Sequence, residues 1–194
     1  MSTFKTFKTL KTKHIANTDN IIRPLRSESI NLNSSALTVF TDFEVHWPLM
    51  LEHSVRVVDA RELMKKAHVR LKLVIDAEER FKGVITAADL VSVRVGRAQQ
   101  ETGLSANEIT VDDVMTPKEH LHALDYDDLA RAKIGDILET MQRGGDQHLL
   151  VVDDSGTAVR GIISASDVAR ALHLPVTISE RATSFAELCK VVNG

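Results

Sequence analysis

Two short stretches of the sequence place a hydroxyl group three residues before a carboxylate. The first motif is Gly83-Val84-Ile85-Thr86-Ala87-Ala88-Asp89, and the second motif is Gly161-Ile162-Ile163-Ser164-Ala165-Ser166-Asp167. At the start of a helix this spacing is typical of a capping box, which satisfies free backbone N–H groups. A helix start also binds phosphate, and a nearby carboxylate can accept hydrogen bonds from the hydroxyls of a ribose. The pattern therefore predicts either two helix caps or two nucleotide sites.

The two motifs belong to a longer repeat. Asp76 and Asp153 are 77 residues apart, whereas Asp89 and Asp167 are 78 residues apart. One residue has therefore been inserted between the Asp and the Gly of the second copy, where segment 154–157 carries the Ser-Gly of a tight turn. Turns tolerate insertions better than strands do. One structural unit is thus written twice.

Each copy of the repeat predicts a helix, a strand, a turn, a second strand and a further helix. The apolar runs 71–75 and 148–152 predict mostly buried strands, and the second strand of each copy ends at the motif. We expect a strand over 36–40 to open the first half and Asp59 to cap the helix that follows. The expected core positions of the two preceding helices are Ala60, Leu63, Met64 and Ala67 in the first and Ile134, Ile137, Leu138 and Met141 in the second, which Gly144-Gly145 would end.

This arrangement resembles a tandem pair of cystathionine-β-synthase (CBS) domains, a Bateman module. The likeness rests on the two motifs, on the helix and buried strand before each, and on Asp113-Val114-Met115-Thr116-Pro117, which opens the second half. It implies an α/β fold of two β-α-β-β-α units packed as a pseudo-two-fold pair. We expect a basic tail over 1–33, CBS domains over 34–98 and 108–175, and a C-terminal tail or helix over 176–194.

The resemblance also implies two clefts that bind adenosine-containing ligands. AMP, ADP, ATP and S-adenosylmethionine all carry the ribose hydroxyls that Asp89 and Asp167 would hold, while Thr86 and Ser164 would hold a phosphate. No other cofactor is expected. Gly83 and Gly161 would allow close approach of backbone or ligand.

In such modules, positive groups often precede each buried strand. Here those residues are Arg70 and His148. Arg70 can form a forked contact with phosphate, whereas His148 is neutral over much of the physiological range. We therefore expect two unequal sites, with the richer anion contacts near Arg70 and with a triphosphate disfavoured.

The composition narrows the class of protein. The chain has 194 residues, 43% apolar and 26% charged, and a net charge of −3. This charge argues against nucleic acid as a main partner, because phosphate backbones require an excess of Lys and Arg. Cys189 is the single cysteine, which excludes an internal disulfide and favours a reducing, cytoplasmic setting without structural zinc. No apolar run approaches the roughly 20 residues of a membrane span.

Three segments leave alternatives open. Phe4, Phe7 and Leu10 alternate with lysines, as in a short basic helix for a membrane surface or an acidic partner, or simply in a tail. The stretch 41–54 is long, and Trp47 within it would either anchor an interface or pack in the loop; its two histidines, His46 and His53, show no metal spacing. The acidic stretch 112–128 is either a solvated surface or a cation site beside a bound phosphate.

No motif for catalysis is recognisable, and no catalytic residue is predicted. Three functions remain: a sensor of an adenosine ligand that signals to a separate effector protein, a ligand-free interaction or scaffold module, and an enzyme hidden in the clefts. We also expect a homodimer. The apolar residues that would form its interface, or would equally suit the core, are Val91, Val95, Val168 and Leu172.

Overall fold

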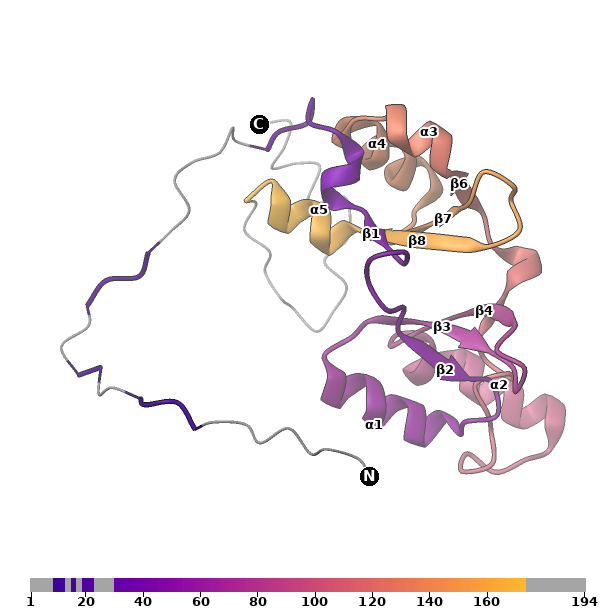
Figure 1. Ribbon diagram of the computed structural model, residues 1–194. Helices are drawn as coiled ribbons and strands as arrows, with labels where there is room; N and C mark the ends of the chain where they lie inside the picture. The colour runs from indigo at the N-terminus through magenta and orange to yellow at the C-terminus, as the bar shows by residue number, and fades with distance from the viewer. Residues whose placement is uncertain (1–8, 13–14, 17–18, 23–29, 174–194) are drawn as a thin grey trace, which may run out of the picture.

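The computed structural model describes residues 9–12, 15–16, 19–22 and 30–173 (Figure 1). The C-terminal segment around Cys189 and the start of the basic tail, including Phe4 and Phe7, lie outside the described residues. Residues 9–12 carry no helix, and Leu10 is exposed.

Two four-stranded mixed sheets form the centre of the fold. The first sheet has the order β2-β3-β4-β5 and the second the order β1-β8-β7-β6. In each, one parallel pair (β2·β3 or β6·β7) is followed by antiparallel neighbours. The bounds are β1 (Thr41–Asp42), β2 (Met50–Glu52), β3 (Leu71–Ile75), β4 (Phe81–Thr86), β5 (Thr116–Pro117), β6 (Ala123–Asp125), β7 (His148–Val152) and β8 (Val159–Ser164).

Helices cover the outer side of each sheet. Figure 1 shows α1 and α2 beyond the first sheet and α3 and α4 beyond the second, so that the two sheets lie between them. We call residues 50–102 the first half and residues 123–171 the second half. The bounds of the helices are α1 (Val57–Ala67), α2 (Val93–Thr102), α3 (Tyr126–Arg131), α4 (Ile134–Gly144) and α5 (Ala165–Ala171), with short 3-10 helices η1 (Ala36–Val39), η2 (Asp89–Val91) and η3 (Lys118–His120).

The two halves exchange the segments that precede them. Thr41 of β1 pairs with Ile162 of β8, and Thr116 of β5 pairs with Val84 of β4. Each segment thus completes the sheet of the other half. The domain boundaries predicted above remain a prediction. β1 pairs with a strand of the second half and β5 with a strand of the first half, so strand pairing crosses these boundaries.

The strand predicted over 36–40 is wrong, because these residues form η1. Ser35 caps it by accepting from the Leu37 N–H at 3.3 Å. Ala36 and Val39, three residues apart, bury their side chains in the core of the second half, against residues such as Leu129 and Ile134. A three-residue period places both on one side of a 3-10 helix, whereas a strand would turn them to opposite faces.

The helix preceding the first buried strand differs in detail from its prediction. It begins at Val57 with Arg56 at the N-cap, so Asp59 lies in the first turn and accepts from Arg56 Nε at 2.7 Å. The expected core face is correct for Ala60 and Met64 but wrong for Leu63 and Ala67, which are exposed. In the second half all four expected core positions of α4 are buried.

The ends of α4 and of the β-hairpins agree with the sequence. Gly145 ends α4 in the left-handed conformation at φ +70°. The turn between β7 and β8 is one residue longer than that between β3 and β4, since Val152 pairs with Val159 and Ile75 pairs with Phe81. The predicted place of the insertion is therefore confirmed.

A third apolar cluster joins the two sheets. Its buried members are Leu73 of β3, Val84 of β4 and Leu150 of β7, and Phe43, Leu71, Phe81, Leu121, Val159 and Ile162 pack around them. Residues of both sheets thus share one cluster between the larger cores of the two halves. Burial of these side chains, at roughly 25 cal/mol per Å² of apolar surface, holds the halves face to face.

The residues expected at a dimer interface divide between surface and core. Val91 is exposed, whereas Val168 is only 1% exposed and belongs to the core of the second half. Val95 and Leu172 are half-buried against the cores of their own halves. Of the two places left open for Val168, the structure shows the core, and the homodimer itself remains a prediction.

Candidate functional site

The first motif spans the junction between β4 and η2. Thr86 ends β4, and its hydroxyl donates to Asp89 Oδ2 at 2.6 Å. The same hydroxyl oxygen accepts from the Asp89 N–H at 3.1 Å, and the Thr86 N–H donates to Asp89 Oδ2 at 2.9 Å. Thr86 and Asp89 therefore bond reciprocally in the pattern of a capping box, across a turn that leads into η2, whose N-cap residue is Ala88.

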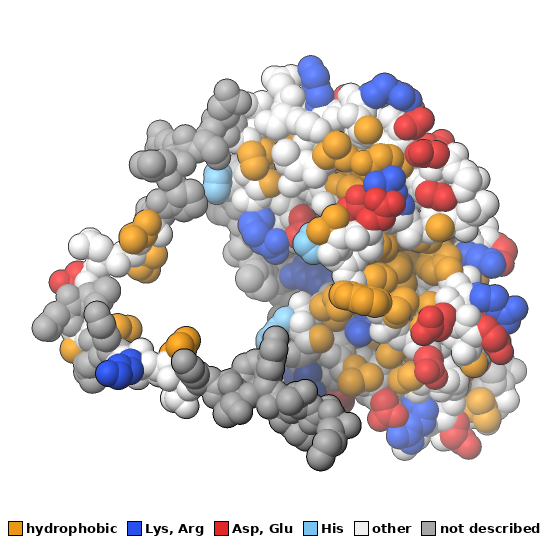
Figure 2. All heavy atoms as spheres, in the orientation of Figure 1, with side chains coloured by type: hydrophobic (Ala, Val, Ile, Leu, Met, Phe, Trp, Pro, Cys, Tyr) orange, Lys and Arg blue, Asp and Glu red, His pale blue; other side chains and the backbone are white. Residues whose placement is uncertain are grey.

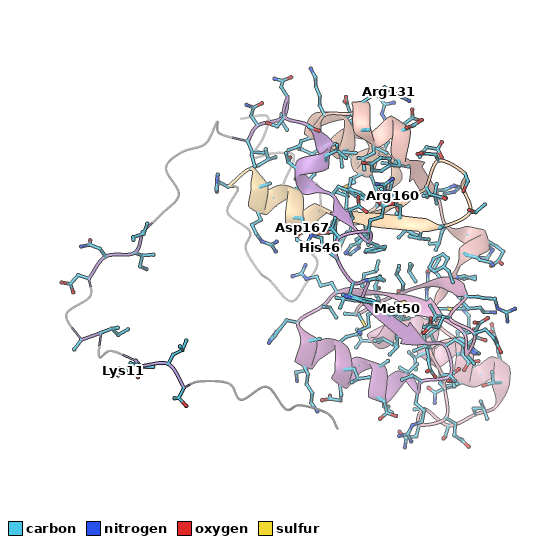
Figure 3. All side chains as sticks on the ribbon, in the orientation of Figure 1. Lys11, His46, Met50, Arg131, Arg160 and Asp167 are labelled. Carbon is cyan, nitrogen blue, oxygen red and sulfur yellow. The ribbon has the colours of Figure 1, made fainter. Side chains whose placement is uncertain are left out.

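The second motif repeats this geometry where β8 meets α5. Figure 3 labels Asp167 at the start of α5. The Ser164 hydroxyl donates to Asp167 Oδ2 at 2.6 Å and accepts from the Asp167 N–H at 3.1 Å. Ser164 is buried, while Asp167 is partly exposed. The hydroxyl that was expected to hold a phosphate donates its proton to the carboxylate in both motifs, and its role toward a ligand remains a prediction.

The same arrangement occurs twice more, outside the two motifs. Ser105 bonds Glu108 Oε2 at 2.6 Å, and Thr110 bonds Asp113 Oδ2 at 2.8 Å, in each case through the hydroxyl. Ser105–Glu108 and Thr110–Asp113 lie in turns between α2 and β5, so a hydroxyl bonded to an acid three residues on is a common local motif in this protein, with or without a helix. Specificity must come from what surrounds the two motifs.

The second oxygen of each motif carboxylate faces an arginine, which sequence reasoning missed. Asp89 Oδ1 lies 3.3 Å from Arg94 Nη1, and Asp167 Oδ1 lies 2.7 Å from Arg170 Nη1. These arginines are 47% and 75% exposed, whereas the two aspartates are 15% and 33% exposed. One carboxylate oxygen is therefore fixed by the cap, and the other is paired with an exposed cation. The signal in the sequence was an Arg within five residues of each motif Asp.

The two motif glycines allow the exchanged strands to approach. A Cβ on Gly83 would overlap the carbonyl oxygen of Thr116, and a Cβ on Gly161 would overlap the ring of Phe40 and the carbonyl oxygen of Thr41. The glycines were expected to allow close approach of either backbone or a ligand. In the structure, backbone atoms and the Phe40 ring occupy the space that a Cβ would need.

Arg70 and His148 do not occupy equivalent positions, contrary to expectation. The Arg70 carbonyl accepts from Ala87 N–H at 2.9 Å, and its counterpart is the Gln147 carbonyl, which accepts from Ala165 N–H at 2.9 Å. His148 is instead the first residue of β7. A shift by one residue in a strand turns the side chain to the other face.

Residues of both halves meet electrostatically at His148. Burial lowers the pKa of this imidazole, the charge of Asp167 opposes that shift, and the charge of Arg70 lowers the pKa further. Arg70 lies in the first half and the other two in the second. Arg70 and Asp167 thus both lie within electrostatic range of His148.

A groove lies beside the first motif. It has a volume of about 290 Å³, near the lower end of the range for small-molecule sites. Both signs of charge line it, with Arg94 bridging from the groove to Asp89. Its lining residues are Arg94, Arg97, Ala98 and Glu101 of α2 and Asp113, Val114, Met115, Thr116, Pro117 and His120 of the segment that leads into the second half.

The remaining candidate features lie at the surface. Trp47 is 91% exposed in the connection between β1 and β2, so it does not pack in its loop. Among the described residues, no group of three or more His, Cys, Asp and Glu side chains is placed to hold a metal ion. Figure 2 shows basic and acidic side chains interspersed over the right-hand part of the face in view.

The comparison with protein families identifies the class. The CBS domain family matches residues 48–96 and 111–174, and the chain belongs to this family as a tandem CBS-domain protein, or Bateman module. The predicted α/β fold with two CBS units is thereby confirmed. No helix in the described part of the chain has the length and apolar character needed to cross a membrane.

Known proteins with similar sequence or fold support this assignment. An uncharacterized 17.7 kDa protein of Acidianus ambivalens is 27% identical over 124 residues, covering 63% of this chain and 66%, just under two thirds, of that protein. A crystal structure from Pyrococcus horikoshii has a TM-score of 0.54 at 22% identity and covers 73% of this chain and 94% of its own. CBSX2, a CBS-pair protein of Arabidopsis thaliana solved in complex with AMP, has a TM-score of 0.53 at 23% identity and covers 71% and 95%.

Proposed function

We propose that this protein is a regulatory module that binds an adenosine nucleotide beside each motif and signals to a separate effector protein. The observation that carries the proposal is that the two carboxylate oxygens of Asp89 have different kinds of partner, and that those of Asp167 do as well. One oxygen is held by the cap at 2.6 Å, which fixes the carboxylate, and the other is paired only with an exposed arginine.

This arrangement suits a ligand that carries both hydroxyl donors and an anion. The ribose hydroxyls can replace the arginine at the free carboxylate oxygen, and the released guanidinium can bind phosphate with its fork of N–H donors. Charge-assisted hydrogen bonds of this type contribute about 1.5 to 3 kcal/mol each. A nucleoside phosphate offers both groups on one molecule.

Two further findings support the proposal. His148 interacts electrostatically with both Asp167 and Arg70, so the second site has a titratable group beside its carboxylate and a permanent cation within range of that group. CBSX2, which shares the fold, is a protein that binds AMP. The module acts by binding, with no chemical step assigned to any of these residues.

A ligand-free interaction module is the second candidate function. The observation that favours it is that Ser105–Glu108 and Thr110–Asp113 form the same hydroxyl-to-carboxylate bond in turns outside the motifs, where it serves local structure. In that case the motif carboxylates serve only to begin helices. The exposed Trp47 would then be available as a contact for a partner.

Native mass spectrometry separates the two functions. We expect the protein to gain the mass of one or two AMP molecules per chain when AMP is added after removal of any retained ligand. Asp89→Asn and Asp167→Asn should each remove one of them, because the amide oxygen of Asn can still accept the local hydrogen bonds but the side chain carries no charge. The matched control Glu108→Gln should bind like the unaltered protein. If the unaltered protein does not bind AMP, the nucleotide-binding function is refuted and the ligand-free interaction module remains.

A further inference from the structure

Arg94 differs from every other arginine near the motifs, because it contacts three residues in two separate segments. Its Nη1 lies 3.3 Å from Asp89 Oδ1, donates to Thr116 Oγ1 at 3.0 Å and lies 3.4 Å from the Val114 carbonyl oxygen. The first contact reaches the motif, and the other two reach the segment that leads into the second half. The guanidinium is therefore held beside the first motif by groups other than Asp89.

The second motif has no equivalent of this residue. The residue 78 positions after Arg94 is Leu172, which packs half-buried against the core of the second half. Asp167 is paired instead with Arg170, an i,i+3 contact within α5 in which the guanidinium is 75% exposed. The first site thus has an anchored cation, and the second has one fixed by a single surface ion pair.

The hydrogen-bond capacity of Asp89 shows what a ligand must do. Its Oδ2 already accepts from both the N–H and the hydroxyl of Thr86, which leaves Oδ1 for a ribose. Hydroxyl donors that take Oδ1 compete with Arg94 for it. An uncharged nucleoside would remove the partner of a cation and offer no anion in exchange, which costs binding energy.

A phosphate group on the ligand reverses this cost. Arg94 keeps its contacts with Thr116 and Val114, so its guanidinium remains at the site and its other N–H donors can accept a phosphate as partner. Arg97 and His120 line the same groove. Glu101 and Asp113 line it as well and would repel further negative charge.

We propose that Arg94 makes the first site selective for a nucleoside monophosphate over both the free nucleoside and the triphosphate. The inference rests on the proposed function, since it deepens the description of the same site. It assigns selectivity to a side chain that lies outside the motif and that the second half lacks.

Isothermal titration calorimetry in the Asp167→Asn background tests the proposal at the first site alone. We expect AMP to bind about tenfold or more tightly than adenosine, as one charge-assisted contact gives, and more tightly than ATP. Arg94→Gln should bring the ratio of the AMP affinity to the adenosine affinity close to one, and Arg94→Lys should restore part of this preference for AMP. Thr116→Val, which removes one anchor and leaves the Asp89 pair, should lower the ratio by a smaller factor.

Arg131→Gln is the matched control, because it removes an ion pair with Asp128 on α3, at the outer end of the second half (Figure 3). It should leave the ratio unchanged. An unchanged ratio in Arg94→Gln and Thr116→Val, with AMP binding still abolished by Asp89→Asn, would overturn the role of Arg94 and leave the proposed function intact. Absence of AMP binding in the otherwise unaltered protein would overturn both.

Discussion

Replacing Gly83 by alanine tests the exchange of segments between the two halves. A Cβ at this position would overlap the Thr116 carbonyl oxygen, and it would lie 2.9 Å from the Pro117 Cα and 3.0 Å from the Thr116 carbonyl carbon. All three atoms belong to the main chain of β5, so no change of rotamer relieves the contact. The strand must move away from β4, where Gly83 pairs with Pro117.

We expect Gly83→Ala to lower the free energy of unfolding by about 1 to 3 kcal/mol, the usual cost of overpacking a well-packed site. In a chain of this length each kcal/mol corresponds to about 2 to 4 °C in melting temperature. The assay is urea denaturation followed by far-UV circular dichroism, with thermal melting as a second readout.

Gly96→Ala is the matched control for this substitution. Gly96 lies within α2, and a Cβ there meets nothing within 4 Å. Alanine should stabilise the helix by about 0.5 to 1 kcal/mol, the opposite sign from Gly83→Ala. If Gly83→Ala proved as stable as the unaltered protein, the close approach of β5 to β4 would be refuted.

Three further changes have outcomes that follow from single contacts. Arg160→Gln should destabilise the fold more than Arg143→Gln does in denaturation experiments. Arg160 is partly buried, holds Asp42 and Glu44 at 3.3 and 2.9 Å and lies 3.5 Å above the Tyr126 ring, whereas Arg143→Gln breaks an exposed pair and should cost less than about 1 kcal/mol. Equal losses would contradict the structural role of Arg160. In an NMR titration of His148, Arg70→Gln should raise the imidazole pKa and Asp167→Asn should lower it, and no change with either variant would show that these charges do not meet across the halves. Hydrogen bonds from Ser155, Ala158 and Thr157 lower the pKa of Asp153, so this carboxyl binds a proton less readily in the folded state than in the unfolded chain. The ionised Asp153 should therefore stabilise the fold fully above about pH 5, and this stabilisation should decline as the pH falls through the lowered pKa. In denaturation experiments at a series of pH values Asp153→Asn should flatten this decline, and an unchanged pH profile would argue against the role of Asp153.

The features that could be predicted from sequence are those that depend on local patterns. The repeat, the buried strands 71–75 and 148–152 and the end of α4 at Gly145 follow from apolar runs and turn residues within a few positions of one another. The inserted residue between β7 and β8 was also found, since a change in spacing from 77 to 78 has only one polar segment in which to occur.

The exchange of segments could not be predicted from such patterns. Ala36 and Val39 read as part of a strand because they are apolar, but their partners Leu129 and Ile134 lie far along the chain. The buried face of α1 is narrower than predicted, since it consists of Val57, Ala60 and Met64 while Leu63 and Ala67 are exposed, and how wide a stripe is covered depends on the neighbouring elements. Non-local packing thus decided what local propensity left open.

The candidate site was predicted in its motif residues but not in their partners. The pairing of hydroxyl and carboxylate within each motif follows from a three-residue spacing, and it is present in both. Arg94 was missed because a break between η2 and α2 at Ser92 redirects the chain, which helical spacing from Asp89 does not show. Gln147 could have been found, since the 77-residue spacing applied to Arg70 leads to it.

The most direct test of the proposed function is the melting temperature of the protein with and without AMP. AMP at about 100 times its dissociation constant should add roughly 2.7 kcal/mol to the free energy of unfolding, which is about 5 to 10 °C for this chain. The Asp89→Asn/Asp167→Asn double variant should not respond, and Glu108→Gln should respond fully. No shift of the unaltered protein, freed of retained ligand, with AMP, ADP, ATP or S-adenosylmethionine at millimolar concentration would contradict the account.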